Sequence, residues 1–436
     1  MNSSQVQRPG GFSPSESSTL IIEAVVEQHA EEAAFLWTTR DRAVHAPHYS
    51  LKDLSGLDER VEAHLDGLRI AGQFGWQLCE QALDKEEPGK LFAAAVLAFD
   101  SEDTGRMHRV LEKGCCAPEL ERELISALGW LSFSTVEGHI RALLGSERPE
   151  IRRIGIAAST VHRWDPGQQL MQALSDPNPR LRAQALKACG EVGITALLPA
   201  ILPSVSDPDD VCRFFAAWSV ARLGDRSPGV LSALHEIAMG HTPYAKRALG
   251  LALRVMDLQQ AKAWHRHLRR DPARLRTAAI ADGIIGDPEA VEYLIEFMYI
   301  PALARVAGEA FSMITGVDLA DDALSGDRPE GFETGPTEDP EDENVAMDPD
   351  ENLPWPVPVL VAKWWDQHRA KFQADRRYFK GSEITIQSLR EVLISGNQPE
   401  RAAAALELAL REPTQPLFEV RARGALQLAE LKRWNT

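Results

Sequence analysis

Residues 176–193 read DPNPRLRAQALKACGEVG, and this stretch decides the fold. A proline in the first turn and a glycine after the last one are typical of a helix with defined ends. Between them, Leu181 is followed four and seven places later by Ala185 and Ala188, which puts the three side chains on one helix face. After the glycine, residues 194–205 predict a second helix. The stretch therefore predicts one helix pair.

The same phrase recurs about every thirty residues between Lys90 and Gly316. Successive anchors are 29, 31, 30, 30, 33, 31 and 28 residues apart, namely Leu91, Leu120, Ile151, Leu181, Val211, Tyr244, Leu275 and Leu303. The residue seven places after the anchor is small or apolar in every unit but one, where it is Asp282. A fixed period predicts stacked helix pairs that share one interior. We therefore expect an all-α fold, an alpha-alpha superhelix or solenoid.

Composition divides the chain into five segments. Residues 1–18 are polar and contain Ser, Pro and Gly, which predicts a disordered N-terminus. Residues 19–89 show helical patterns without the repeat phrase, as expected of a cap on a solenoid. The repeats occupy residues 90–317, and residues 318–352 form an acidic insertion. Residues 353–436 return to helical patterns and are expected to form C-terminal repeats at the far end of the same solenoid.

The chain has 436 residues and a formal net charge of -17. This charge opposes binding to nucleic acid, because such affinity depends on Lys and Arg contacts to phosphates. Residues 318–352 hold 14 acidic residues and the single base Arg328, which is a net -13. Together with repeated Pro and Gly, this composition predicts a long and largely irregular insertion.

The cysteines and the N-terminus both favour a cytoplasmic protein. The five cysteines are odd in number and form no C-x-x-C pair, which suits buried thiols in a reducing compartment: Cys79, Cys115, Cys116, Cys189 and Cys212. The first apolar run, residues 20–26, is broken by Glu23. The sequence therefore predicts neither a secretory signal nor a membrane span.

Arginines follow most anchors by one or two places: Arg122, Arg152, Arg153, Arg182, Arg213, Arg276 and Arg305. One interpretation is a basic stripe that holds an acidic partner or the acidic insertion of the chain itself. The favoured interpretation is pairing with turn aspartates of neighbouring units, such as Asp176, Asp207 and Asp271. Exposed pairs of this kind contribute only about 0–1 kcal/mol each.

Two further groups are candidates for protein binding. The insertion carries the acidic cluster Asp339, Glu341, Asp342 and Glu343, which we expect to be a solvated arm able to dock on a basic partner. Trp355, Trp364 and Trp365 form either an exposed recognition patch or, as large aromatics at helical spacing usually do, part of the core.

The sequence predicts no catalytic, cofactor-binding or metal-binding residue. Phosphate-loop, dinucleotide, zinc-helix and nucleophile-elbow motifs are absent. Asp348, Asp350 and Glu351 are suitable calcium ligands, but they do not fit the twelve-residue calcium loop. A metal site at His45, His48 and His64 is disfavoured because Pro47 separates the first two. We therefore expect a protein that is not an enzyme.

The sequence pattern of residues 176–210 resembles HEAT repeats, in the short-period form related to phycobilisome lyase repeats. Nearly the whole chain resembles an uncharacterised bacterial family of HEAT-repeat proteins, through the segments EQHAEEAAFLW (27–37), APHY (46–49), FSMITGVDL (311–319), DPDENLPW (348–355) and RAAAALELAL (401–410). Genes of that family often lie beside type VI secretion genes, including those for spike and PAAR-like proteins.

The resemblance implies a HEAT-like solenoid that acts as an accessory, adaptor or chaperone and binds a type VI secretion effector or a spike or PAAR-like component. One alternative is an immunity-type inhibitor whose acidic insertion covers a basic toxin. A third hypothesis is an enzyme on a HEAT-like scaffold, either a metal-dependent hydroxylase or a glycosylase.

Overall fold

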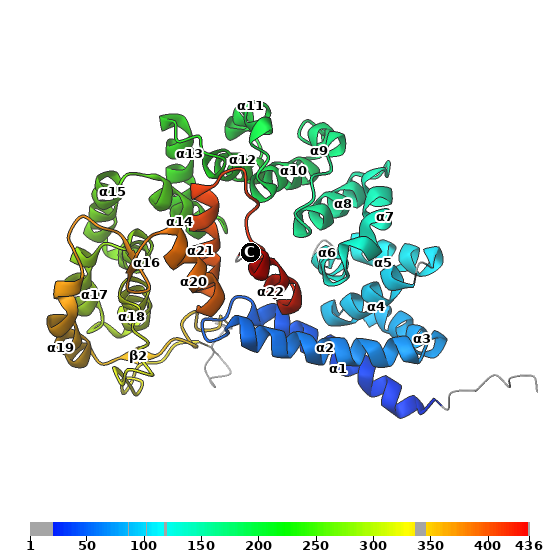
Figure 1. Ribbon diagram of the computed structural model, residues 1–436, viewed down its shortest axis with the longest axis horizontal. Helices are drawn as coiled ribbons and strands as arrows, with labels where there is room; N and C mark the ends of the chain where they lie inside the picture. The colour runs from blue at the N-terminus through cyan, green and yellow to red at the C-terminus, as the bar shows by residue number, and fades with distance from the viewer. Residues whose placement is uncertain (1–20, 86, 102, 117–119, 336–345, 435–436) are drawn as a thin grey trace, which may run out of the picture.

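The computed structural model describes residues 21–85, 87–101, 103–116, 120–335 and 346–434. In these residues it contains 22 α-helices and four two-residue strands, so the predicted all-α solenoid is confirmed (Figure 1). The segment expected to be disordered, residues 1–18, lies outside the described residues.

The helices of the repeats form two layers (Figure 1). Each inner helix packs on the next one: α4 (Pro88–Asp100), α6 (Glu121–Trp130), α8 (Pro149–Val161), α10 (Pro179–Val192), α12 (Asp210–Arg222), α14 (Ala245–Val255), α16 (Leu275–Ile285) and α18 (Pro301–Thr315). The outer helices connect them: α5 (Thr104–Cys116), α7 (Phe133–Leu144), α9 (Gln168–Ala173), α11 (Leu198–Ile201), α13 (Pro228–Met239), α15 (Leu258–Arg270) and α17 (Val291–Phe297). The N-terminal cap is formed by α1 (Glu23–Ala43), α2 (Leu51–Ile70) and α3 (Gln73–Ala82).

The repeat phrase marks the inner helices, since each of the eight anchors lies on one of them or immediately before it. All eight residues seven places after an anchor are buried, Asp282 included. One apolar cluster runs from Val26 to Ile285, as expected when neighbouring units share an interior. Small side chains such as Ala185 and Ala188, both fully buried, permit this close stacking of the inner layer.

Local capping explains where the inner helices begin and end. The side chain of Asn178 accepts hydrogen bonds from the backbone N–H groups of Arg180 and Leu181 at the start of α10. Asp209 does the same at the start of α12. At the end of α10, Gly193 adopts a left-handed conformation with φ of +86°. The starts of α10 and α12 and the end of α10 therefore follow local capping signals, whereas the second helix expected over residues 194–205 is divided into two 3₁₀ turns, Thr195–Leu197 and Leu202–Ser206, with the four-residue α11 between them.

The last part of the chain differs from the expected far end of a solenoid. After α19 (Pro358–His368), the hairpin of β3 (Tyr378–Phe379) and β4 (Ser382–Glu383) leads to α20 (Ile386–Ser395), α21 (Gln398–Arg411) and α22 (Gly424–Arg433). These last three helices lie inside the curve of the superhelix (Figure 1). The backbone N–H of Gln398 donates to the carbonyl of Tyr49, and that of Gly424 donates to Asp58 on α2. The C-terminal region therefore fills the concave side and reaches the N-terminal cap.

The acidic insertion is anchored at both of its ends. Its strand β1 (Ser325–Gly326) pairs in antiparallel fashion with β2 (Trp355–Pro356). Leu319 and Leu324 are buried in a second apolar cluster with α18 and α19. The described part of the insertion is thus largely irregular in secondary structure but packed onto the solenoid. Short 3₁₀ turns occur at Leu83–Lys85, Thr195–Leu197, Leu202–Ser206, Pro272–Arg274, Pro288–Ala290 and Arg369–Lys371.

Candidate functional site

An extended segment, residues 412–423, crosses the concave face between α21 and α22, and we call it the strap (Figure 1). The inner helices hold its main chain. The N–H of Leu417 donates to the carbonyl of Glu191 at 2.8 Å. Arg163 donates to the carbonyl of Leu417, and Arg222, which is fully buried, donates to the carbonyls of Pro413 and Gln415. Most of this recognition is therefore directed at the backbone.

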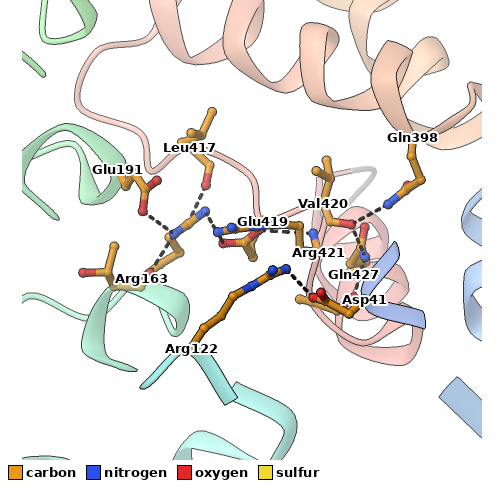
Figure 2. Close-up of polar contacts among 12 residues, drawn as sticks. Asp41, Arg122, Arg163, Glu191, Gln398, Leu417, Glu419, Val420, Arg421 and Gln427 are labelled. Atoms are coloured by element: carbon orange, nitrogen blue, oxygen red, sulfur yellow. Dashed lines mark hydrogen bonds and ion pairs between the residues drawn. The ribbon is translucent and has the colours of Figure 1, made fainter. Parts of the chain in front are cut away.

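A charge network fixes the middle of the strap (Figure 2). The buried carboxylate of Glu419 lies 3.2 Å from Arg163 on the solenoid and 2.8 Å from Arg421 on the strap. Burial alone raises the pKa of the Glu419 carboxyl, but the positive charges of Arg421 and Arg163 outweigh it and hold the pKa far below its usual range. Glu419 is therefore ionised at neutral pH and attaches the strap electrostatically.

A buried polar cluster holds the end of the strap. The amides of Gln398 and Gln427 both donate to the carbonyl of Val420, at 3.1 and 2.9 Å (Figure 2). Arg401 is fully buried and donates to the side-chain oxygens of both glutamines and to the carbonyl of Leu393. Burial lowers the pKa of Arg401 to about 10. Because these groups satisfy one another, the strap has one defined path from α21 to α22.

Two cavities flank the strap. The smaller one, of about 230 Å³, lies between the strap and the first repeats and is lined by Trp37, Arg122 and Trp130 among others. The larger one, of about 500 Å³, lies between the strap and the middle repeats and is lined by Trp218, Arg247 and Leu406 among others. Lys187, Glu191 and the strap residues Glu419 and Arg421 border both. The concave side is therefore divided into two hollows.

Three of the arginines that follow the anchors pair with aspartates at the turns of the repeats. Arg152 lies 2.7 Å from Asp176, and Arg182 lies 2.9 Å from Asp207, in each case the turn aspartate of the next unit. Arg213 instead contacts Asp210 of its own unit and donates to the carbonyl of Asp207. Asp271 lies 3.2 Å from Arg274 in its own turn. These side chains are thus engaged within the solenoid.

The last two arginines of the stripe hold the acidic insertion. Arg276 donates twice to the carboxylate of Asp350, at 2.7 and 2.5 Å. Arg305, which is buried, contacts Asp348 at 2.5 Å and the carbonyl of Asp350 at 2.8 Å. The interpretation in which the stripe grips the acidic insertion is therefore realised at these two positions. The candidate residues Asp339, Glu341, Asp342 and Glu343 lie outside the described residues.

The three candidate tryptophans differ in exposure. Trp365 is buried, whereas Trp355 and Trp364 are half-buried. The guanidinium of Arg305 lies 4.3 Å from the ring centre of Trp355, and the ring of Trp364 stacks on His368 at 4.1 Å. Packing within the protein thus accounts for much of their surface.

The groups weighed for metal binding have other contacts. Nδ1 of His64 lies 3.1 Å from Nδ1 of His29, and the ring of His48 packs against that of Tyr49 at 4.8 Å. Within the described residues, no group of three or more His, Cys, Asp or Glu side chains is arranged to hold a metal ion.

Asp282, the polar exception among the positions seven places after an anchor, forms a buried polar junction: its carboxylate lies 2.9 Å from Nε2 of His265. Burial raises the pKa of the Asp282 carboxyl.

Sequence reasoning missed the strap and the residues that bind it, above all Arg163, Arg222 and Glu419. The only local signal is weak. The segment PTQPLFEV (413–420) contains two prolines and has no helical periodicity, which predicts a non-helical connection. The structure shows in addition that Arg163 adopts a positive φ of +54°, which the sequence does not indicate. Nor does the sequence indicate which surface the strap contacts.

The comparison with known families agrees with the geometry of the middle of the chain. The family described as HEAT repeats matches residues 167–254, from just before α9 to the end of α14. No curated protein matches the chain. No helix among the described residues is both long and apolar enough to cross a membrane. The chain is therefore an all-α solenoid, and its residues 167–254 are similar to HEAT repeats.

Proposed function

We propose that this protein is a non-enzymatic protein-binding scaffold that serves as an adaptor or chaperone for a type VI secretion effector or a spike or PAAR-like component. HEAT repeats are typical of protein-binding scaffolds, and the resemblance to proteins encoded beside type VI secretion genes supports the kind of partner. The strap and α22 occupy much of the concave side, so the partner surface lies elsewhere.

The observation that carries the proposal is a group of exposed apolar side chains just after the end of α17 and at the start of α19. Tyr299, Ile300, Val359 and Leu360 are exposed by 62%, 43%, 65% and 40%, and we call them the α17–α19 patch. The two helices pack together (Figure 1). Exposed apolar groups that lie together on a soluble protein mark interaction surfaces.

The helix pairing brings the four side chains of the α17–α19 patch to one end. Glu292, near the start of α17, lies 4.0 Å from Arg369, just after the end of α19. The two helices therefore run in opposite directions, and the end of α17 meets the start of α19. The buried Trp365 and the half-buried Trp364 belong to the apolar cluster formed by α17, α18 and α19.

The acidic insertion supports the alternative, an inhibitor of a basic toxin, less well. Two of its carboxylates, Asp348 and Asp350, are already bound by Arg305 and Arg276. Replacing Asp339, Glu341, Asp342 and Glu343 by Asn and Gln discriminates the two functions and keeps β1 and the buried Leu324 in place. The inhibitor then loses protection of the host cell, whereas the scaffold keeps a partner bound at the α17–α19 patch.

The test is affinity purification from a host strain with its secretion cluster intact. The wild-type protein is expected to enrich at least one component of that cluster. The double variant Tyr299→Ser, Val359→Ser is expected to lose it. The matched control Ile70→Ser, Met171→Ser changes side chains exposed by 78% and 56% elsewhere and is expected to retain it. Enrichment of no cluster component by the wild type, or equal enrichment by both variants, contradicts the proposal.

A further inference from the structure

The larger cavity beside the strap has the size and lining of a small-molecule site. Its volume of about 500 Å³ falls within the range of roughly 300–1,000 Å³ that is usual for such sites. Part of the lining is apolar, with Ile284 from α16, Leu406 from α21 and Phe418 from the strap. A ligand here would have an apolar body in contact with three separate elements.

The charged part of the lining is predominantly positive. It holds six basic side chains and three acidic ones, an excess of three positive charges in a chain of net charge -17: Arg163, Lys187, Lys246, Arg247, Arg254 and Arg421 against Glu191, Glu309 and Glu419. Four of the six have acidic neighbours. Arg163 and Arg421 contact Glu419, Lys187 lies 3.8 Å from Glu191, and Arg254 lies 3.4 Å from Glu407.

The two remaining cations have no such neighbour. Among the residues that the structure describes, no carboxylate lies within 4.0 Å of the charged groups of Lys246 or Arg247. Burial raises the pKa of the Glu309 carboxyl, the one lining acid without an ion pair, and the nearby charge of Lys246 opposes this rise. Both side chains are exposed to the solvent of the cavity.

Aromatic rings position the guanidinium of Arg247. Its central carbon lies 5.4, 5.5 and 5.6 Å from the ring centres of Phe214, Phe215 and Trp218. Such contacts orient a cation without neutralising its charge. Desolvation by the surrounding protein lowers the pKa of Arg247.

We propose that this cavity binds a small organic anion, with its carboxylate or sulfonate held by Lys246 and Arg247 and its apolar body packed against Ile284, Leu406 and Phe418. Lys246 and Arg247 both lie on α14. The guanidinium of Arg247 can donate to two anionic oxygens at once, and the ammonium group of Lys246 supplies a second positive charge. No residue of the α17–α19 patch lines this cavity, so the proposal does not depend on the protein-binding role.

Isothermal titration calorimetry with decanoate and with 1-anilinonaphthalene-8-sulfonate tests the proposal on the full chain. We expect one site for at least one of the two probes. Decanamide, which has no charge, is expected to bind more weakly than decanoate. The variant Lys246→Gln, Arg247→Gln is expected to bind at least about tenfold more weakly, because it removes charge-assisted hydrogen bonds.

The matched control is Lys52→Gln, Lys363→Gln, which removes the same charge from exposed positions on α2 and α19. It is expected to bind as the wild type does. Thermal unfolding of both variants checks that the fold is intact. Absence of saturable binding of both probes at about 1 mM, or equal weakening in the two double variants, overturns the proposal.

Discussion

Replacing Glu419 by glutamine removes the charge that attaches the strap while keeping the shape of the side chain. The pair with Arg421 joins two residues of the strap itself, so it does not attach the strap to the solenoid. The pair with Arg163 is more buried and is separated by 3.2 Å. At an effective dielectric constant of about 20, its attraction is about 5 kcal/mol. Glutamine avoids the desolvation cost of the carboxylate, which offsets part of this attraction, so we expect a loss of about 2–3 kcal/mol in the free energy of unfolding.

Urea denaturation at neutral pH measures this loss in Glu419→Gln. The control is Glu412→Gln, which makes the same change at an exposed strap position with no ion pair among the described residues. We expect the control to remain within about 0.5 kcal/mol of the wild type. A loss in Glu419→Gln no larger than that of the control would refute the reasoning.

The same variant predicts a pH dependence. Because the folded-state pKa of Glu419 is lowered, the stability it provides is present above its unfolded-state pKa of about 4.3 and is lost as the pH falls below that value. The difference between wild type and Glu419→Gln is therefore expected to be full at neutral pH and to shrink below about pH 4. A difference that stays constant down to pH 3 would contradict an electrostatic role.

Two further predictions test the contacts of the C-terminal region and of the insertion. A Cβ at Gly193 would lie 2.8 Å from the carbonyl oxygen of Gln415, whereas one at Gly167 meets no atom within 4 Å. Gly193 adopts the left-handed conformation, whereas Gly167, with φ of +63° and ψ of -118°, does not and is no matched control. The backbone alone would cost Gly193→Ala about 1–2 kcal/mol, and the contact with the strap is expected to raise the loss to about twice that in urea denaturation; a loss no larger than the backbone cost would argue against the strap contact. Arg305→Gln is expected to speed amide hydrogen exchange in residues 348–355 while leaving α10 unchanged, and unaltered exchange there would show that Arg305 does not anchor the insertion.

The inner helices could be predicted because their signals are local. An anchor such as Leu181, the small residues that follow it and the capping Asn178 lie within one helix, and the period of the repeat extends the result to the neighbouring units. The pairs formed by Arg152 and Arg182 follow from the same period, since each joins one unit to the next.

The strap could not be predicted, because its contacts join positions far apart in the chain. Arg163 and Leu417 are separated by 254 positions, and Arg222 and Gln415 by 193. No repeat period relates such positions. The composition of the last 84 residues resembles that of the repeats, but it does not specify whether their helices extend the solenoid or fold back onto its concave side.

The exchange rate of the Leu417 amide hydrogen tests most directly whether the strap lies on the concave face. This N–H donates to the carbonyl of Glu191 at 2.8 Å. Native-state hydrogen exchange is predicted to show protection of at least about a hundredfold at Leu417, which corresponds to an opening free energy of about 2.7 kcal/mol. Exchange of Leu417 at the rate of an unstructured peptide, with the amides of α10 still protected, would contradict it.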